Sequence, residues 1–216
     1  MINYNEAFNS AKLIPGAHKY HSEWKKNAKK FRKLMLGQSK AELDFLYSDN
    51  EVCKMDIFTP GPYAKASMIF VHGGFWTDYD KSYFSHLAMG PVLNDIRVVV
   101  PDLPKCPDLT IPEITSELLK CVNTVSRRFR GDIILVGHQS GGYLASRMVC
   151  KGALAEDILQ RINHVMAISP ISDLRPLIFT KRKDDLNLTE EIAEFESLVD
   201  LESVSYTHLR AHETDR

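Results

Sequence analysis

Residues 132–142 read DIILVGHQSGG, and this stretch decides the fold of the 216-residue chain. Its first five residues form a continuous apolar run of strand length, and residues 142–150, GYLASRMVC, continue with apolar side chains at helical spacing. The glycines between the two segments allow a sharp turn from strand to helix, which exposes a nucleophile at the top of a sheet. We interpret GHQSGG as a G-x-S-x-G nucleophile elbow in which Ser140 is the catalytic residue.

The segments around this stretch repeat the alternation of strand and helix. Runs of strand length, rich in valine and isoleucine, occur at residues 67–71, 96–100, 132–136 and 164–168, and helix-length stretches lie between them at 82–93, 111–129 and 142–152. Continuous apolar runs suit strands that are covered on both faces. The alternation predicts a mostly parallel sheet with right-handed crossovers and helices on both faces.

Two segments nearer the N-terminus extend the predicted architecture. Residues 52–58, VCKMDIF, half-alternate, which is typical of an early strand that faces water on one side. Residues 21–36 place apolar side chains at i, i+4, i+7 and i+11, starting at Trp24, with lysines between them. This spacing predicts an amphipathic helix that packs one apolar stripe onto the rest of the domain.

A second motif, FVHGGFW at residues 70–76, directly follows the predicted strand at 67–71. Glycines in such a loop let backbone N–H groups point into a site, because they carry no Cβ to obstruct them. We expect Gly73 or Gly74, together with the N–H of Gly141, to form an oxyanion hole for the attacked carbonyl. His72 is expected to orient this loop rather than to act as the general base.

The composition excludes several classes of function. With 44% hydrophobic and 25% charged residues and a formal net charge of -1, the chain has the balance of a globular domain and no overall field for nucleic acid or an anionic membrane. No apolar run approaches the length of a membrane span, and the polar start does not look like a signal peptide, so a cytoplasmic protein is expected. The four cysteines form no CxxC pair, which argues against a zinc or redox site.

Because both motifs lie in the expected loops and in the expected order, the chain resembles the arylformamidases, or kynurenine formamidases, of the α/β-hydrolase superfamily. The similarity includes YNEAF at 4–8, DKSYFSHLA at 80–88, CPDLTIPEI at 106–114 and SPISDLRPL at 169–177, and it extends to about Val199. HGG and G-x-S-x-G are specific for the superfamily only. HGGFW together with DKS and SDLRPL favours a formamidase.

The resemblance implies hydrolysis of N-formyl-L-kynurenine to L-kynurenine and formate in tryptophan degradation, with no metal or organic cofactor. Ser140 would attack the formyl carbon, and water would hydrolyse the formyl-enzyme. Phe75, Trp76 and Tyr143 are candidates for the apolar wall of the pocket for the small-molecule substrate, and a role as ordinary core aromatics is equally consistent with the sequence. The sequence leaves a homo-oligomer open.

The C-terminal part departs from the pattern of the superfamily, in which the acid and the histidine of the triad follow later strands. Only one clear strand follows Ser140, so we expect a single domain at 1–203 that lacks the last strands and a non-native tail at 204–216. Asp173 is expected to be a loop residue, His164 lies at the wrong end of its strand, and His208 and His212 lie in the tail. The acid and the base are therefore expected to be missing.

Two other functions remain open at this stage. A carboxylesterase for small esters could use the same nucleophile and oxyanion hole. A non-catalytic binding protein of the same fold would fit a chain without a complete triad.

Overall fold

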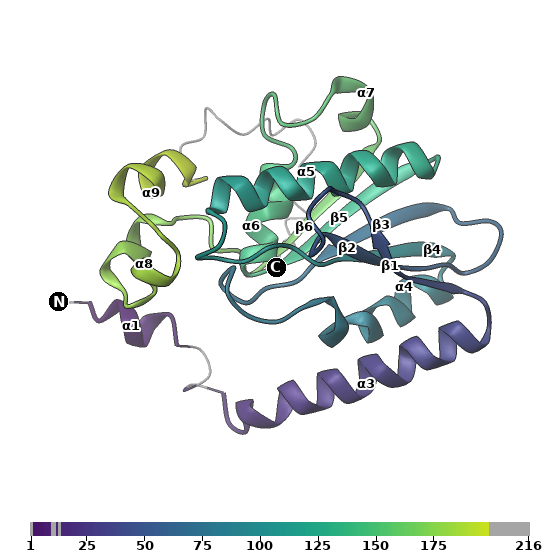
Figure 1. Ribbon diagram of the computed structural model, residues 1–216, viewed down its shortest axis with the longest axis horizontal. Coiled ribbons are helices and arrows are strands. Elements are labelled where there is room, and N and C mark those ends of the chain that lie inside the picture. The colour runs from purple at the N-terminus through teal and green to yellow at the C-terminus, as the bar shows by residue number, and fades with distance from the viewer. Residues whose placement is uncertain (1, 10–11, 13, 199–216) are drawn as a thin grey trace, which may run out of the picture.

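The computed structural model describes residues 2–9, 12 and 14–198, so His208, His212 and the predicted tail lie outside the described residues. A six-stranded sheet forms the centre, in the order β1-β2-β4-β3-β5-β6 (Figure 1). The strands are β1 (Ala41–Leu46), β2 (Lys54–Phe58), β3 (Ala66–Val71), β4 (Ile96–Pro101), β5 (Asp132–His138) and β6 (Ile162–Ile168). Strands β4, β3, β5 and β6 run parallel to one another, whereas β1 and β2 are antiparallel to their neighbours. The mostly parallel sheet predicted from the alternation is confirmed.

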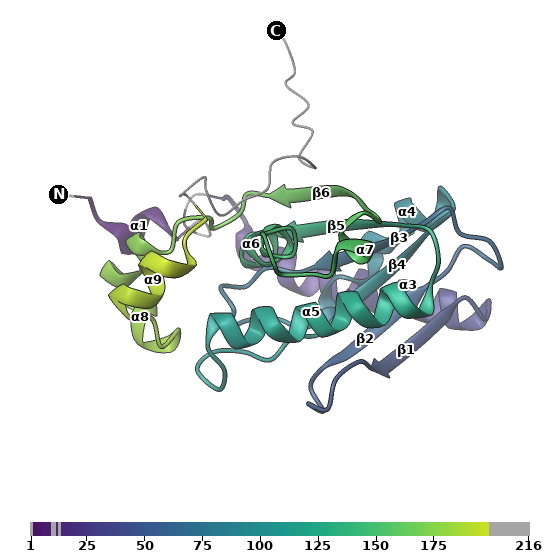
Figure 2. The same cartoon turned by 90° about the horizontal axis from the view of Figure 1, so that it is seen from above.

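Helices cover both faces of this sheet. The α-helices are α1 (Tyr4–Ala7), α3 (Ala17–Gly37), α4 (Met89–Leu93), α5 (Ile111–Arg128), α6 (Ser140–Arg147), α7 (Glu156–Leu159), α8 (Arg182–Asp185) and α9 (Glu190–Glu196), and the 3-10 turns are η1 (Lys81–Tyr83), η2 (Ser85–Ala88) and η3 (Arg175–Phe179). Helices α3 and α4 lie on one face, and α5 and α6 lie on the other (Figures 1 and 2). Within the described residues, no helix combines the length and the apolar character that crossing a membrane requires.

The two faces correspond to two apolar cores, and β4 shows how one strand serves both. Val99 packs with α5 and α6, whereas Val98 and Val100 pack with Phe31 of α3 and Val92 of α4. Side chains alternate across a strand, so a run of valines buries both faces at once. The apolar run of β4 therefore reflects burial on both faces of the sheet, as expected.

Helix α5 begins where its sequence provides a cap. The backbone N–H of Thr110 donates to the carboxylate of Glu113 at 2.7 Å, and the two residues form a capping box. Pro112 follows in the first turn, where a missing N–H costs nothing. The helix then lays a stripe of buried apolar residues on the sheet beside the predicted elbow.

The structure corrects two predictions about elements. Strand β2 is nearly all buried rather than open to water on one side, because Met55 and Ile57 join the core with α5 while Phe58 packs against Phe31 of α3. It lies between β4 and β1, a strand that was not predicted. The helix expected at 82–93 is divided into η1, η2 and the short α4. For a sheet that lacks the last strands, the run at 164–168 was expected to form an apolar edge, and within the described residues β6 is an edge strand whose side chains are partly or largely exposed after Ile162.

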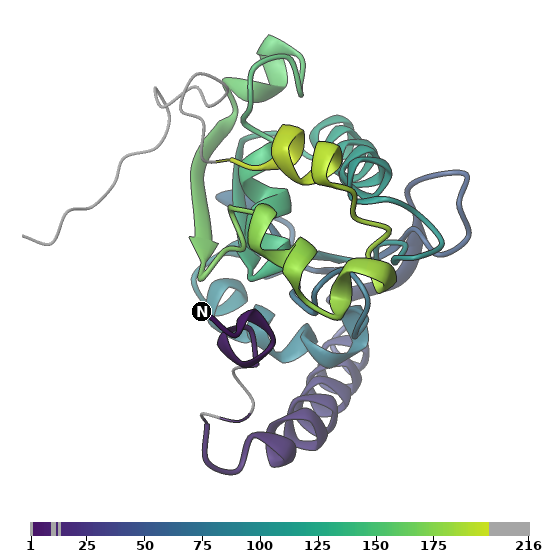
Figure 3. The same cartoon turned by 90° about the vertical axis from the view of Figure 1, so that its left-hand side faces the viewer.

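The N-terminal and C-terminal segments meet at one end of the sheet. In Figure 3, α1 lies beside the chain that leads into α8. The Tyr4 and Phe179 rings stack with their centroids 5.7 Å apart, and the N–H of Lys181 donates to Asn5 at 2.9 Å. These contacts hold both segments at the end of the sheet where the parallel strands terminate.

Candidate active site

The strand-to-helix turn between β5 and α6 depends on two glycines four residues apart. A Cβ at Gly137 would overlap the backbone of Gly141, and a Cβ at Gly141 would overlap the carbonyl oxygen of Val71 on β3. Both positions therefore exclude any side chain. Such close approach of backbone to backbone is what a nucleophile elbow requires on either side of its central residue.

The central residue of this turn is Gln139, and not Ser140. Gln139 lies halfway between Gly137 and Gly141 and has φ 53° and ψ −115°, a left-handed φ that a residue with a side chain rarely adopts. Ser140 is the first residue of α6. The interpretation of GHQSGG as G-x-S-x-G is therefore shifted by one residue, because glycines around Ser140 would have to stand at 138 and 142, and residue 138 is histidine.

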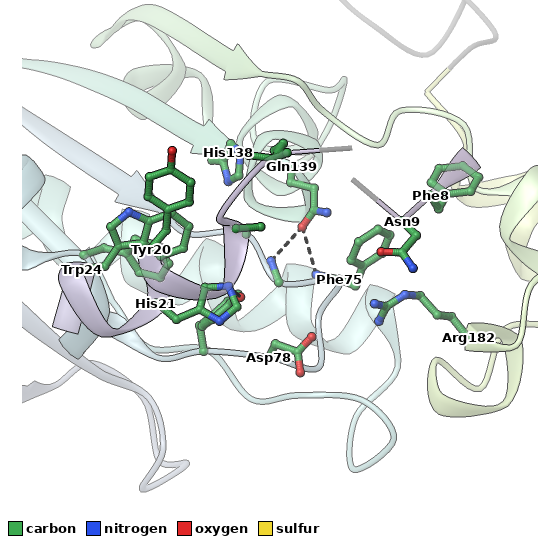
Figure 4. A pocket seen from close by; sticks show the side chains of 16 residues that line it. Phe8, Asn9, Tyr20, His21, Trp24, Phe75, Asp78, His138, Gln139 and Arg182 are labelled. Atoms are coloured by element: carbon green, nitrogen blue, oxygen red, sulfur yellow. Dashed lines mark hydrogen bonds between the residues drawn. The ribbon is translucent and has the colours of Figure 1, made fainter. Parts of the chain in front are cut away.

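The Gln139 side chain occupies the acceptor position in front of the HGG loop. Its Oε1 accepts hydrogen bonds from the N–H of Gly74 at 2.9 Å and from the N–H of Phe75 at 3.2 Å (Figure 4). These paired backbone donors have the arrangement of an oxyanion hole. An amide oxygen of the protein itself thus occupies both donors in this structure.

The glycines predicted for the oxyanion hole have different roles in the structure. Gly74, with φ 125°, supplies one of the two donors, and Phe75 supplies the other, which the sequence had not indicated. A Cβ at Gly73 would come within 3.0 Å of His138 and Gln139, and Gly141 makes the close approach to β3 described above. We find that Gly73 and Gly141 provide space for backbone packing.

Ser140 is buried, with 2% of its surface exposed. It lines a small pocket of about 20 Å³ together with His72 and Trp76, and it does not line the larger pocket. The space is sufficient for about one water molecule. Ser140 therefore lacks the access to substrate that the predicted nucleophile needs.

The larger pocket, of about 390 Å³, lies on the other side of the HGG loop. Its lining combines that loop and the elbow with the N-terminal segment and α8: Phe8, Asn9, Ile14, Ala17, Tyr20, His21, Trp24, Gly73, Gly74, Phe75, Asp78, Tyr79, Phe84, His138, Gln139 and Arg182 (Figure 4). The N-terminal aromatic residues and Arg182 were not predicted as pocket residues, because they are far from the HGG loop along the sequence and only the fold brings them next to it.

Only one of the three predicted wall aromatics lies in this pocket. Phe75 lines it, whereas Trp76 lines the small pocket beside Ser140. Tyr143 is fully buried, packs edge-on against Trp76 and donates to the Glu196 carboxylate at 2.8 Å. Trp76 and Tyr143 do not line this pocket and belong to the buried core, which agrees with the alternative that they are ordinary core aromatics.

His72 is a structural part of the HGG loop. Its Nδ1 is 2.7 Å from the carbonyl oxygen of Gly73, and its ring stacks on Phe84 with an interplanar angle of 11°. Burial lowers the pKa of His72, because a charged imidazole would lose its hydration. Burial also lowers the pKa of His138, which lies at the edge of the pocket.

The other acidic and histidine candidates lie away from the pocket. Asp173 forms an ion pair with Arg175 at 2.9 Å, and this guanidinium holds the pKa of the Asp173 carboxyl below its usual value. It also accepts a hydrogen bond from Ser197 at 3.2 Å. His164 is exposed on β6.

Below the HGG loop, the DKS stretch anchors the chain through a buried ammonium group. Lys81 pairs with Asp44 at 2.7 Å and Asp56 at 2.8 Å, and Asp102 lies 3.8 Å away. These carboxylates belong to β1, β2 and the end of β4, so one side chain ties η1 to three strands. Burial raises the pKa of Asp102 to about 6 even though Lys81 favours its ionised form.

A mostly parallel sheet with helices on both faces, a glycine-flanked elbow after β5 and paired N–H donors after β3 define an α/β-hydrolase fold. Residues 68–207 match the sequence profile described as the alpha/beta hydrolase family, and the chain belongs to that family.

The similar proteins include kynurenine formamidases and esterases. The chain is 26% identical to the kynurenine formamidase of Danio rerio over 155 residues, which are 70% of this chain and 53% of that protein. It thus spans about half the length of the curated relatives it matches. A crystal structure from Silicibacter sp. TM1040, provisionally described as a thioesterase, is 34% identical with a TM-score of 0.88, over 93% of this chain and 76% of that one. Esterase B of Lactobacillus rhamnosis shares the fold at 16% identity and a TM-score of 0.60, over 84% and 69% of the two chains.

Proposed function

We propose that this chain is a formamidase-like member of the α/β-hydrolase family that binds an aryl formamide or a related carbonyl compound in the pocket, without cleaving it through an elbow nucleophile. The observation that carries the proposal is Gln139 at the apex of the elbow. A carboxamide has no proton that a general base can remove at neutral pH, so it lacks the chemistry of the serine, cysteine or aspartate nucleophiles that work by covalent catalysis.

The position of the Gln139 oxygen supports the same conclusion. Because its Oε1 already accepts from Gly74 and Phe75, the donors that would stabilise a tetrahedral intermediate are occupied in this structure. A ligand carbonyl would have to displace the Gln139 side chain or bind beside it. The aromatic lining of the pocket and its volume of about 390 Å³ suit a ligand with one aromatic ring.

The second candidate function is the hydrolysis of N-formyl-L-kynurenine with Ser140 as nucleophile. The kynurenine formamidases among the relatives favour this reaction, and the esterases among the structural neighbours favour a small ester as substrate. The burial of Ser140 beside a cavity of about 20 Å³ opposes both forms of the second candidate.

The test compares the unchanged chain with Gln139→Ala and Ser140→Ala. Hydrolysis of N-formyl-L-kynurenine and p-nitrophenyl acetate is measured, and formanilide binding is followed by calorimetry. We expect no turnover that depends on Ser140, and tighter formanilide binding by Gln139→Ala, because two backbone donors become free. A turnover that Ser140→Ala lowers by about 10⁴ or more, as triad serines do, would overturn the proposal in favour of hydrolysis.

A further inference from the structure

Arg182 brings a positive charge to a pocket that is otherwise largely aromatic. It is the first residue of α8, and its guanidinium lies over the ring of Phe75 at 4.0 Å from the ring centroid. Stacking of this kind fixes the plane of a guanidinium while leaving the N–H groups at its edge available. Because Phe75 is also one of the two donors of the HGG loop, the charge is held beside the loop that forms the proposed carbonyl site.

The N–H donors of the Arg182 guanidinium are available to a ligand. Within the described part of the chain, the Arg182 side chain contacts the Phe75 ring, forms no ion pair and donates to no oxygen of the protein. A half-buried arginine that has no carboxylate partner in the protein can pair with the carboxylate of a ligand. Guanidinium and carboxylate groups match in a geometry with two parallel hydrogen bonds.

The other charged and titratable groups of the pocket leave this role to Arg182. Asp78 lines the pocket but is exposed, so solvent and salt screen its repulsion of an anion. His21 is engaged with the Tyr79 hydroxyl at 2.6 Å, and His138 lies at the elbow. In Figure 4, Arg182 and the ring pair Tyr20 and Trp24 lie at opposite sides of the pocket.

We infer that Arg182 makes the pocket selective for aryl carboxylates: the aromatic body of the ligand packs against the N-terminal rings, and its carboxylate pairs with the guanidinium. This inference rests on the proposed function, since it names the ligand class of the same pocket. It assigns to α8 a specificity-determining residue, which lies at least 106 positions along the chain from the HGG motif at 72–76.

The experiment uses two probes that differ by one group: N-formylanthranilate, which carries a carboxylate beside its formamide, and formanilide, which does not. Calorimetry measures both with the unchanged chain and with Arg182→Met, and Lys183→Met is the control, because it removes the same charge from an exposed neighbour that does not line the pocket. We expect the unchanged chain and the control to prefer the anion by roughly 10- to 100-fold.

The Arg182→Met variant is expected to lose this preference while its affinity for formanilide stays unchanged, which also shows that the pocket remains folded. Equal binding of the two probes by the unchanged chain, or a preference that survives Arg182→Met, overturns the inference and leaves the proposed function standing. Binding of neither probe overturns both.

Discussion

At the residue scale, Gln139 shows how a motif can be recognised in the correct place and still be assigned to the wrong residue. The two glycines that cannot carry a Cβ, Gly137 and Gly141, define the turn, and the residue midway between them occupies its apex. Counting from the glycines, rather than from the serine, identifies Gln139 from the sequence alone. The contact of its side chain with Gly74 and Phe75 was beyond the sequence, because it depends on how two distant loops meet.

The space around Gly141 leads to a prediction about stability. Gly141→Ala should lower the free energy of unfolding by more than about 4 kcal/mol, because the new Cβ would overlap the carbonyl oxygen of Val71 in a rigid strand. Gly90→Ala is the matched control, since a Cβ there meets nothing within 4 Å. Urea unfolding of both variants checks the prediction, and similar midpoints for the two would show that the elbow is able to move apart.

At the scale of elements, the buried cluster around Lys81 explains how η1 is joined to the sheet. Lys81 and Asp56 are both buried, and an unpaired charge at either position would be costly. The sequence stretch DKS indicated a family resemblance, but it could not show that its lysine reaches carboxylates on three strands. Those partners are set by the order of strands in the sheet.

This cluster predicts how stability depends on pH. Because burial raises the pKa of Asp102 from 3.8 to about 6, the native state keeps a proton that the unfolded chain releases near pH 4. The native state thus binds more protons between pH 4 and 6, and the Asp102 contribution to the free energy of unfolding falls by at most about 3 kcal/mol as the pH rises through this range.

Asp102→Asn should remove this fall in the free energy of unfolding, because an amide does not titrate. The amide oxygen can still accept from the N–H of Lys81, which lies 2.6 Å from the Asp102 carboxylate in the unchanged chain. The measurement is chemical unfolding from pH 4 to 7, with Asp95→Asn as the control at an exposed surface carboxylate. A pH profile of Asp102→Asn that is parallel to that of the unchanged chain would contradict the assignment.

At the scale of the whole molecule, the sequence predicted what local patterns encode and missed what the assembly of segments creates. The valine run of β4 and the capped helix α5 follow from their own residues. Strand β1 was missed although residues 41–45 alternate apolar and charged side chains, as a half-exposed strand does, and its place beside β2 comes from pairing. The pocket was missed in the same way, because it needs α3, the HGG loop and α8 together.

Strand β6 combines an apolar sequence with an exposed position at the edge of the sheet. Its apolar run HVMAI has the composition of a strand covered on both faces, yet Met166 is 58% exposed and Ile168 is 42% exposed, and within the described residues only β5 pairs with it, as expected for a sheet without its last strands. Unpaired backbone groups beside exposed apolar side chains favour pairing with another strand. We therefore expect the 216-residue chain to self-associate through this edge.

Met166→Lys should raise the concentration at which half of the chain is associated by about tenfold, because a lysine on an edge strand must lose part of its hydration when a second edge docks. Sedimentation velocity over a range of protein concentrations measures the shift. Phe195→Lys is the matched control: Phe195 is 79% exposed but lies on α9, away from the edge, so its replacement should leave association unchanged. A chain that stays monomeric at all concentrations would contradict the prediction. If instead Phe195→Lys alone disperses the associated chain, Phe195 of α9 and not β6 makes the contact.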